Sequence, residues 1–339
     1  MRRGVEVMKA VVCQGNPVGG APSREEIIDY WKQQLAAVPQ LTEIEYRDNF
    51  SPDKLDEVAA DKDVIIGAWI GDDVFDRAFM ERHPNLKYVA TLGHGFGRFD
   101  REAARELGVT FTNTIYGDMT IAQYGMGLLL NICHHIDAEA ACYKESLEQH
   151  EAMNRKKKRV ATRQIELYEK TIGIIGLGSI GFWMAKMAAG FGMKVVAYSR
   201  HKKEGAQYQF IEQVSFDELL ERSDVISINC PLTDETRNMI DADAISRMKD
   251  GVILINTARG AIIDEAAMVE ALRSGKIYAA GLDVVTGEPL SEKTPIFDCG
   301  NALITSHIAW APAEARYRTV RVAVENVKNW LAGSPTSVI

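Results

Sequence analysis

The sequence predicts an α/β fold with two domains, each built on an open, doubly wound parallel sheet. Short apolar runs alternate with stretches of helical periodicity along nearly the whole chain, a pattern typical of parallel strands joined by crossover helices. A length of 339 residues also exceeds what one hydrophobic core usually serves. We therefore expect two separate cores, with the polypeptide passing from one domain to the other.

The first domain is predicted to alternate strands and helices from residue 8 onward. Strands are expected at 8–13, 41–46, 64–69, 86–92 and 109–113, and helices at 23–38, 53–60, 72–82 and 100–107. A long amphipathic stretch, about 120–146, then leads into the second domain.

The second domain is predicted to begin its sheet with a strand at 171–175, followed by a glycine-rich turn and a helix. Gly176, Gly178 and Gly181 have the G-x-G-x-x-G spacing of dinucleotide-binding, Rossmann-like units. In such units the glycines permit a tight turn, close approach to pyrophosphate and close helix packing. The N–H groups of Ser179 and Ile180 would face the phosphates at the helix N-terminus.

The rest of the chain continues the same alternation. Strands are expected at 194–198, 224–230, 251–256, 278–284 and 301–307, and helices at 242–249 and 264–274. A further helix at 313–331 is expected to return to the first domain. The predicted domains are 1–117 with 310–339 for substrate binding and 118–309 for the dinucleotide, with the active site in the cleft between them.

Composition narrows the classes of function. A net charge of −8 disfavours nucleic acid as the main partner, and no apolar run reaches the roughly 18 residues that span a bilayer. The five cysteines lack C-x-x-C spacing and no apolar segment follows the basic N-terminus, so we expect reduced, buried thiols in a cytoplasmic protein without a metal site. The basic run 155–159 is better explained as a solvated helix face than as a localisation or phosphate-binding patch.

Three reactive side chains each follow a strand of the second predicted sheet: Arg259, Glu288 and His307. Histidine suits proton transfer to a ketone oxygen during hydride reduction. A paired glutamate favours the imidazolium, and arginine offers a planar fork of donors to a carboxylate. Singly, each has a structural alternative: a bonded histidine at a strand end, a turn residue before Pro289, or a neutraliser of a helix C-terminus or surface acid. Together they favour catalysis.

The chain resembles the D-isomer-specific 2-hydroxyacid dehydrogenases. The matching segments are GLGSIG, NCPLTDETRNMI, INTARGAIID, GLDVVTGEP and SHIAW, in the family order, together with ATLGHGFGRFDREAARELGVTFTN. The resemblance implies that Arg259 binds the keto-acid carboxylate and carbonyl, that Glu288 tunes the histidine and that His307 is the acid/base. It also implies that the loop Leu92, Gly93, His94 and Gly95 binds substrate and that Cys230, Pro231, Thr236, Thr257, Ala258, Arg259, Asp283 and His307 line the cofactor.

The chain departs from the family pattern at several positions. His94 replaces a small or apolar residue, Phe96 and Gly97 replace a tyrosine and a polar residue, and Ile115 replaces a proline. The tryptophan often found before the first strand of the cofactor domain is missing. His94 could contact a polar end of the substrate, or it could simply face solvent.

The predicted activity is the reduction of small 2-keto acids to D-2-hydroxy acids with a nicotinamide dinucleotide. Trp310 after SHIA resembles the glycerate, glyoxylate and hydroxypyruvate reductase branch. The alternatives are a dinucleotide-sensing corepressor, or a D-lactate, phosphite or formate dehydrogenase of the same fold. By resemblance we expect a homodimer, through the stretch 120–146.

The cofactor is predicted to be NADP(H) rather than NAD(H), with NAD(H) still possible. An NAD enzyme places a carboxylate about 20 residues beyond the glycine motif to bind the ribose 2′-hydroxyl. Here Ser199 stands at that place, and Arg200 and Lys202 follow it. A small hydroxyl leaves room for a 2′-phosphate, which Arg200 can bind with help from Lys202. The alternative is a solvated basic turn.

Overall fold

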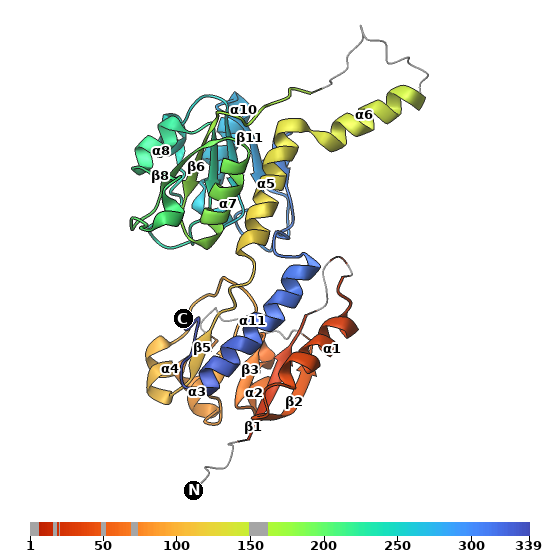
Figure 1. Ribbon diagram of the computed structural model, residues 1–339, viewed down its shortest axis with the longest axis vertical. Helices are drawn as coiled ribbons and strands as arrows, with labels where there is room; N and C mark the ends of the chain where they lie inside the picture. The colour runs from red at the N-terminus through yellow and green to blue at the C-terminus, as the bar shows by residue number, and fades with distance from the viewer. Residues whose placement is uncertain (1–6, 16–18, 20, 49–51, 69–73, 149–161) are drawn as a thin grey trace. The chain divides into compact units, whose positions relative to one another are not determined.

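The computed structural model describes residues 7–15, 19, 21–48, 52–68, 74–148 and 162–339 (Figure 1). The chain forms two compact units: unit 1 is Met1–Gly117 with Trp310–Ile339, and unit 2 is Asp118–Ala309. Each unit contains a parallel sheet with helices on its faces and its own buried apolar clusters. The predicted α/β class with two parallel sheets is therefore confirmed. The basic run 155–159 lies outside the described residues.

Unit 1 has a five-stranded parallel sheet of order β2-β1-β3-β4-β5. Helices α1 and α11 pack on one face of this sheet, and α2, α3 and α4 pack on the other. The C-terminal helix thus packs on the sheet of unit 1. The elements are β1 (Met8–Cys13), α1 (Arg24–Leu35), β2 (Leu41–Arg47), α2 (Leu55–Ala59), β3 (Val64–Ile66), α3 (Arg77–Arg82), β4 (Tyr88–Ala90), α4 (Arg101–Leu107), β5 (Thr110–Thr112) and α11 (Ala313–Leu331).

Unit 2 has a seven-stranded parallel sheet of order β12-β11-β10-β9-β6-β7-β8. The chain order reverses between β6 and β9, the kind of switch point where doubly wound sheets bind ligands. The elements are α5 (Asp118–His134), α6 (Ile136–Glu148), β6 (Thr171–Ile175), α7 (Ser179–Gly190), β7 (Lys194–Tyr198), β8 (Glu212–Gln213), α8 (Phe216–Arg222), β9 (Val225–Ile228), α9 (Ala242–Arg247), β10 (Val252–Asn256), α10 (Glu265–Ser274), β11 (Ile277–Leu282) and β12 (Ala302–Ile304).

Some elements differ from their predicted bounds for local reasons. The helix expected over 72–82 begins at Arg77, because the side chain of Asp76 caps it by accepting the N–H of Phe79 at 2.7 Å. The stretch 120–146 divides into α5 and α6 at His135, whose φ of +47° cannot continue a right-handed helix. None of the helices in the described part of the chain combines the length and apolar character needed to cross a bilayer.

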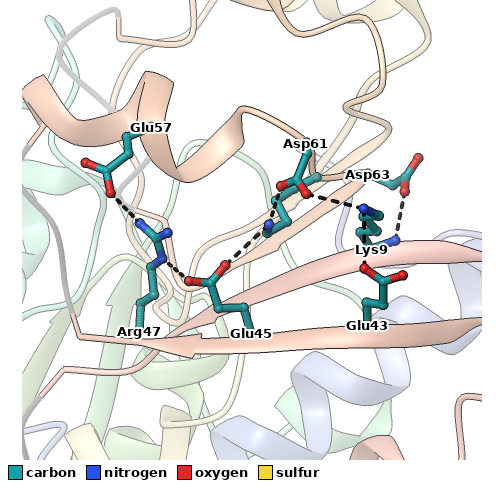
Figure 2. Close-up of polar contacts among 8 residues, drawn as sticks. Lys9, Glu43, Glu45, Arg47, Glu57, Asp61 and Asp63 are labelled. Atoms are coloured by element: carbon teal, nitrogen blue, oxygen red, sulfur yellow. Dashed lines mark hydrogen bonds and ion pairs between the residues drawn. The ribbon is translucent and has the colours of Figure 1, made fainter.

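The edge strand β2 carries a row of charged side chains (Figure 2). Lys9 Nζ lies 3.3 Å from Glu43 Oε2 and 3.4 Å from Asp61 Oδ2, and Arg47 Nη1 donates to Glu57 Oε1 at 3.0 Å. Glu45 accepts from both Arg47 and Lys62. Most of these side chains are exposed, and exposed ion pairs add little stability. Charges along an edge strand do, however, oppose pairing with a strand of another molecule.

In each sheet one carboxylate joins the first strand to its neighbour across the switch in strand order, by the same contact. In unit 1, Asp63 precedes β3 and accepts the N–H of Lys9 in β1 at 2.8 Å. In unit 2, Asp224 precedes β9 and accepts the N–H of Thr171 in β6 at 2.8 Å. Lys249 Nζ also donates to Asp224 at 3.0 Å. The two sheets therefore begin their central strand pairs in the same way.

Candidate active site

The candidate residues of unit 2 follow six strands at one edge of its sheet. Because all six strands run parallel, their carboxyl ends meet at that edge. The loops concerned follow β6, β7, β9, β10, β11 and β12. The sheet thus brings the predicted cofactor and catalytic loops of unit 2 to one side.

The three motif glycines have distinct structural roles. Gly176 has a φ of +92°, and a Cβ there would lie 2.7 Å from the backbone nitrogen of Cys230. A Cβ on Gly181 would lie 2.1 Å from the carbonyl oxygen of Gly176, so this glycine lets α7 approach the turn. At Gly178, which caps α7, a Cβ would meet no heavy atom within 4 Å. The open position at the helix N-terminus, beside Ser179 and Ile180, fits a pyrophosphate.

The turn after β7 contains the residues expected to read the cofactor's 2′ position. Ser199 is half-buried, and its hydroxyl donates to the carbonyl of His201 at 2.8 Å. Arg200 and Lys202 are exposed, and Arg200 Nη1 pairs with Glu235 Oε2 at 3.1 Å. Because both partners of that pair are exposed, it is weak and can exchange for another anion.

The loop after β9 is closed by Thr236. Its hydroxyl donates to the carbonyl of Pro231 at 2.7 Å and accepts the N–H of Thr233 at 2.8 Å. Cys230 opens the loop, and burial raises the pKa of its thiol to about 11. A thiol with that pKa stays protonated at neutral pH, so Cys230 is not a nucleophile here.

The loop after β10 holds Arg259. The fully buried Asn256 donates from Nδ2 to the carbonyl of Arg259 at 2.9 Å and accepts the N–H of Ala258 at 2.9 Å. The half-buried Arg259 donates from Nη1 to the carbonyl of Ala258 at 2.7 Å. A Cβ on the next residue, Gly260, would lie 2.0 Å from the backbone of Val285. This glycine therefore lets the arginine loop lie against the loop after β11.

Glu288 and His307 form a direct pair. His307 Nδ1 and Glu288 Oε2 lie 2.8 Å apart, and Glu288 Oε1 accepts the N–H of Val285 at 2.6 Å. A carboxylate can only accept, so the pairing places a proton on Nδ1 of the imidazole. The imidazole remains 44% exposed, enough to meet a small ligand.

Asp283 holds the loop that carries the histidine. Its carboxylate is fully buried and accepts from the hydroxyl of Thr305 at 2.7 Å and from the N–H groups of Ile308 at 2.9 Å and Ala309 at 2.8 Å. The N–H of His307 donates to the carbonyl of Asp283 at 2.8 Å. These bonds hold His307 at a φ of +56°, a conformation that non-glycine residues rarely adopt.

The predicted substrate loop, Leu92 to Gly95, lies in unit 1 directly after β4. Its histidine does not merely face solvent. His94 is half-buried, and its Nε2 accepts the N–H groups of Gly117 at 2.9 Å and Tyr116 at 3.2 Å. The imidazole therefore bonds to the backbone segment that leads out of unit 1.

The sequence did not lead us to the positioning residue Asn256. It led us to Asp283 as a cofactor residue, but not to its role in holding the histidine loop. Both are fully buried polar residues at or just beyond the end of an apolar strand, β10 or β11. Buried polar groups need partners. A polar residue closing a strand such as VILIN was therefore the signal that could have identified Asn256. The contact of Asp283 with a cofactor stays a prediction.

Residues 126–309 match the family model for the D-isomer specific 2-hydroxyacid dehydrogenase, NAD binding domain. A hydroxypyruvate reductase of Blautia hydrogenotrophica is 40% identical over 264 residues, covering 78% of this chain and 81% of that protein. The crystal structure of a glyoxylate reductase from Paecilomyes thermophila superposes with a TM-score of 0.78, at 27% identity and covering 98% of both chains. An acyclic imino acid reductase in complex with NADPH and D-Arg also has a TM-score of 0.78, at 26% identity, covering 98% of this chain and 100% of that one.

A glycine turn that fits a pyrophosphate and a histidine–glutamate pair, both at the carboxyl edge of one parallel sheet, are features expected of an oxidoreductase that uses a nicotinamide dinucleotide. This chain belongs to the D-isomer specific 2-hydroxyacid dehydrogenase family, as the family model and the identity to the hydroxypyruvate reductase show. The resemblance noted in the sequence is thereby confirmed.

Proposed function

We propose that this enzyme reduces small 2-keto acids of the glyoxylate and hydroxypyruvate type to D-2-hydroxy acids, with NADPH preferred over NADH. The observation that carries the proposal is the 2.8 Å contact between His307 Nδ1 and Glu288 Oε2. The similarity to a hydroxypyruvate reductase and to a glyoxylate reductase supports the substrate class.

The chain's own residues then divide the work of the reduction. Glu288 favours the imidazolium form of His307, which gives a proton to the substrate oxygen. Arg259 uses one N–H on the Ala258 carbonyl, and a guanidinium has five, so it can still bind a carboxylate and polarise the adjacent carbonyl. The resemblance to the family supports a role for the backbone N–H groups of the Leu92–Gly95 loop in binding the substrate carboxylate. A bound reduced nicotinamide would supply the hydride.

The test is steady-state turnover of a panel of 2-keto acids with NADPH and NADH. We expect turnover of glyoxylate or hydroxypyruvate, and His307→Ala should lower kcat by about 10²-fold or more while the Kd of NADPH stays unchanged. A dinucleotide-sensing corepressor would bind the cofactor tightly and turn over negligibly. Near-normal turnover in His307→Ala would remove that histidine from the proton-transfer step.

The NADPH preference is proposed from the turn after β7. Ser199 leaves room for a 2′-phosphate, and Arg200 can exchange its exposed partner Glu235 for that phosphate. We expect kcat/KM for NADPH to exceed that for NADH by about 10-fold, the ratio that corresponds to about 1.4 kcal/mol. The double substitution Ser199→Asp with Arg200→Ala should reverse the preference. Glu235→Gln should instead strengthen it, because a competing anion is removed. Equal kcat/KM values in the wild type would show that this turn does not read the 2′ position.

We further propose that the enzyme is a cytoplasmic homodimer that uses α5 and α6. Helix α6 has exposed apolar side chains, including Ile136 at 60% and Tyr143 at 50%. A 13-residue helix with so little burial is marginal on its own. Light scattering after gel filtration should give twice the chain mass of 37.6 kDa. Ile136→Glu with Tyr143→Glu should then give a monomer; a wild-type monomer would contradict the proposal.

A further inference from the structure

Two backbone segments of unit 1 lie side by side around His94. One is the Leu92–Gly95 loop, and the other is residues 113–117, the last residues of unit 1 before α5 begins. The backbone joins them once, where the N–H of Thr114 donates to the carbonyl of Gly93 at 3.1 Å. Asn113 Nδ2 adds a bond to the carbonyl of His94 at 2.8 Å.

The imidazole of His94 supplies further contacts between the two segments. Its Nε2 accepts from Gly117 at 2.9 Å and from Tyr116 at 3.2 Å, and its ring packs against the Tyr116 ring at a centroid distance of 5.5 Å. A nitrogen that accepts from two N–H groups carries no proton of its own. The bonded form of His94 is therefore the neutral imidazole.

The segment that His94 holds is itself fixed to the rest of unit 1. Arg318 in α11 donates from Nη1 to the carbonyl of Tyr116 at 3.0 Å, and Asn326 donates to the carbonyl of Asn113 at 3.0 Å. The anchor is thus a rigid one. The two bonds to the imidazole therefore restrict the conformations of the Leu92–Gly95 loop more than the backbone bond alone would.

We propose that His94 is a positioning residue for the substrate carboxylate. Its neutral imidazole fixes the Leu92–Gly95 loop on residues 113–117, so that the loop's N–H groups point in one direction. This inference rests on the proposed function for its consequence, but the anchoring itself does not. A small or apolar residue at this position has no acceptor and cannot make the two bonds.

Acid should release this anchor, because histidine is the side chain that gains a proton between pH 7 and pH 5. A protonated Nε2 would face two N–H donors. Charged and titratable groups on and around the bonded segment include Tyr116 itself, Asp118 directly after Gly117, Arg318 on the Tyr116 carbonyl, and Arg316, which interacts with the Tyr116 side chain. The contact is therefore present at neutral pH and is lost as the pH falls.

The test uses two variants with side chains of nearly equal size. Glutamine in His94→Gln has a side-chain oxygen that can accept the two N–H groups, whereas methionine in His94→Met has no strong acceptor. We expect His94→Met, which loses both hydrogen bonds, to raise KM for the keto acid about five-fold, corresponding to about 1 kcal/mol, with KM for NADPH unchanged. His94→Gln should restore KM. It should also abolish the rise of wild-type KM between pH 7 and pH 5.5.

Amide hydrogen exchange on the cofactor-bound protein gives a readout that does not depend on turnover. The amide of Gly117 should exchange at least about 10-fold faster in His94→Met than in the wild type or His94→Gln. Equal exchange in all three proteins would overturn the anchoring. Wild-type turnover with KM unchanged in both variants would overturn the positioning role and leave the proposed function standing. If the wild type reduces no keto acid, the proposed function fails, and the exchange of Gly117 still decides the anchoring.

Discussion

His307 combines an uncommon backbone conformation with an accessible side chain. Its φ of +56° costs about 1–3 kcal/mol, which the surrounding bonds must offset. The buried carboxylate of Asp283 does this by binding the two N–H groups that follow, at Ile308 and Ala309. The histidine is thus held from its backbone on one side and from Glu288 through Nδ1 on the other.

Replacing Glu288 by glutamine should change the pH dependence of the reduction. The amide keeps a hydrogen-bond acceptor but loses the negative charge that favours the imidazolium. Keto-acid reduction needs that protonated form, so activity is lost as the pH rises. We expect the alkaline limb of kcat/KM to move to lower pH in Glu288→Gln, measured from pH 5 to pH 10. The exposed Glu292→Gln is the control and should leave the profile unchanged. An unaltered profile in Glu288→Gln would show that Glu288 does not influence proton transfer by His307.

Asp283→Asn should damage the histidine loop without touching the histidine. The amide nitrogen would then face the N–H of Ala309 or Ile308 or the hydroxyl of Thr305, so a buried donor would lose its acceptor. Such a change costs about 1–3 kcal/mol. We expect kcat to fall at least about 10-fold and the free energy of unfolding to fall by that amount. Asp298→Asn, which removes only an exposed pair with Lys293, should change neither. Wild-type kcat in Asp283→Asn would show that the loop is held by other contacts.

The chemistry of the reactive residues could be predicted from the sequence, but their supports could not. Arg259, Glu288 and His307 follow strands of one parallel sheet, so a strand pattern already places them at one edge. The pairing of Glu288 with His307 was expected, and the structure brings the two together. The bond from His94 to Gly117 spans 23 residues and depends on the path of the backbone, which no local pattern encodes.

Alanine substitutions at two glycines of the turn before α7 should separate thermal stability from cofactor binding. Gly181→Ala places a Cβ 2.1 Å from the carbonyl oxygen of Gly176 and should cost about 3 kcal/mol, which corresponds to a fall in Tm of about 6–12 °C. Gly178→Ala meets no atom within 4 Å and has an ordinary φ of −80°, so Tm should not change.

The Kd of NADPH should change more in Gly178→Ala than in Gly181→Ala, the reverse of the effect on Tm. In Gly178→Ala the methyl group occupies the space beside the helix N-terminus, so the Kd of NADPH should rise about 10-fold or more. Calorimetry on the two variants measures both quantities. A normal Kd in Gly178→Ala would place the pyrophosphate elsewhere, and a normal Tm in Gly181→Ala would mean that α7 can shift.

The predicted bounds of helices and strands match the observed bounds best where capping residues and glycines mark the same ends. The helix predicted at 313–331 has those bounds in the structure, and α10 begins after Asp264 and ends before Gly275, as its capping residues dictate. The two-residue strand β8 is too short to give a periodic signal. Helix α8 does have a local signal in the sequence, since Ser215 and Glu218 form a capping box at its N-terminus.

The five cysteines should differ sharply in their reactivity toward iodoacetamide. Burial raises the pKa of Cys13 to about 12 and those of Cys133 and Cys230 to about 11, and Cys299 is 7% exposed. Cys142 on α6 is exposed, so the expectation of buried thiols is wrong for this residue.

At pH 8 the native enzyme should therefore take up one label per chain within the time that denatured protein takes up five. A thiol of pKa 11 is about 10⁻³ ionised at that pH. Mass spectrometry of peptides should place the label on Cys142, and Cys142→Ser should take up none. Early labelling of Cys230 in the native protein would show that its loop opens.

Unit 1 is divided in the sequence, because residues 118–309 of unit 2 lie between its two parts. Helix α11 supplies Val320 and Val327 to the cluster around Trp31, and residues 337 and 339 bond to the strand end at 111–113. During synthesis the whole of unit 2 leaves the ribosome before α11 does. Unit 2 can then reach its native fold while one face of the first sheet is covered by α1 alone. The part of the enzyme that is translated first is therefore completed last.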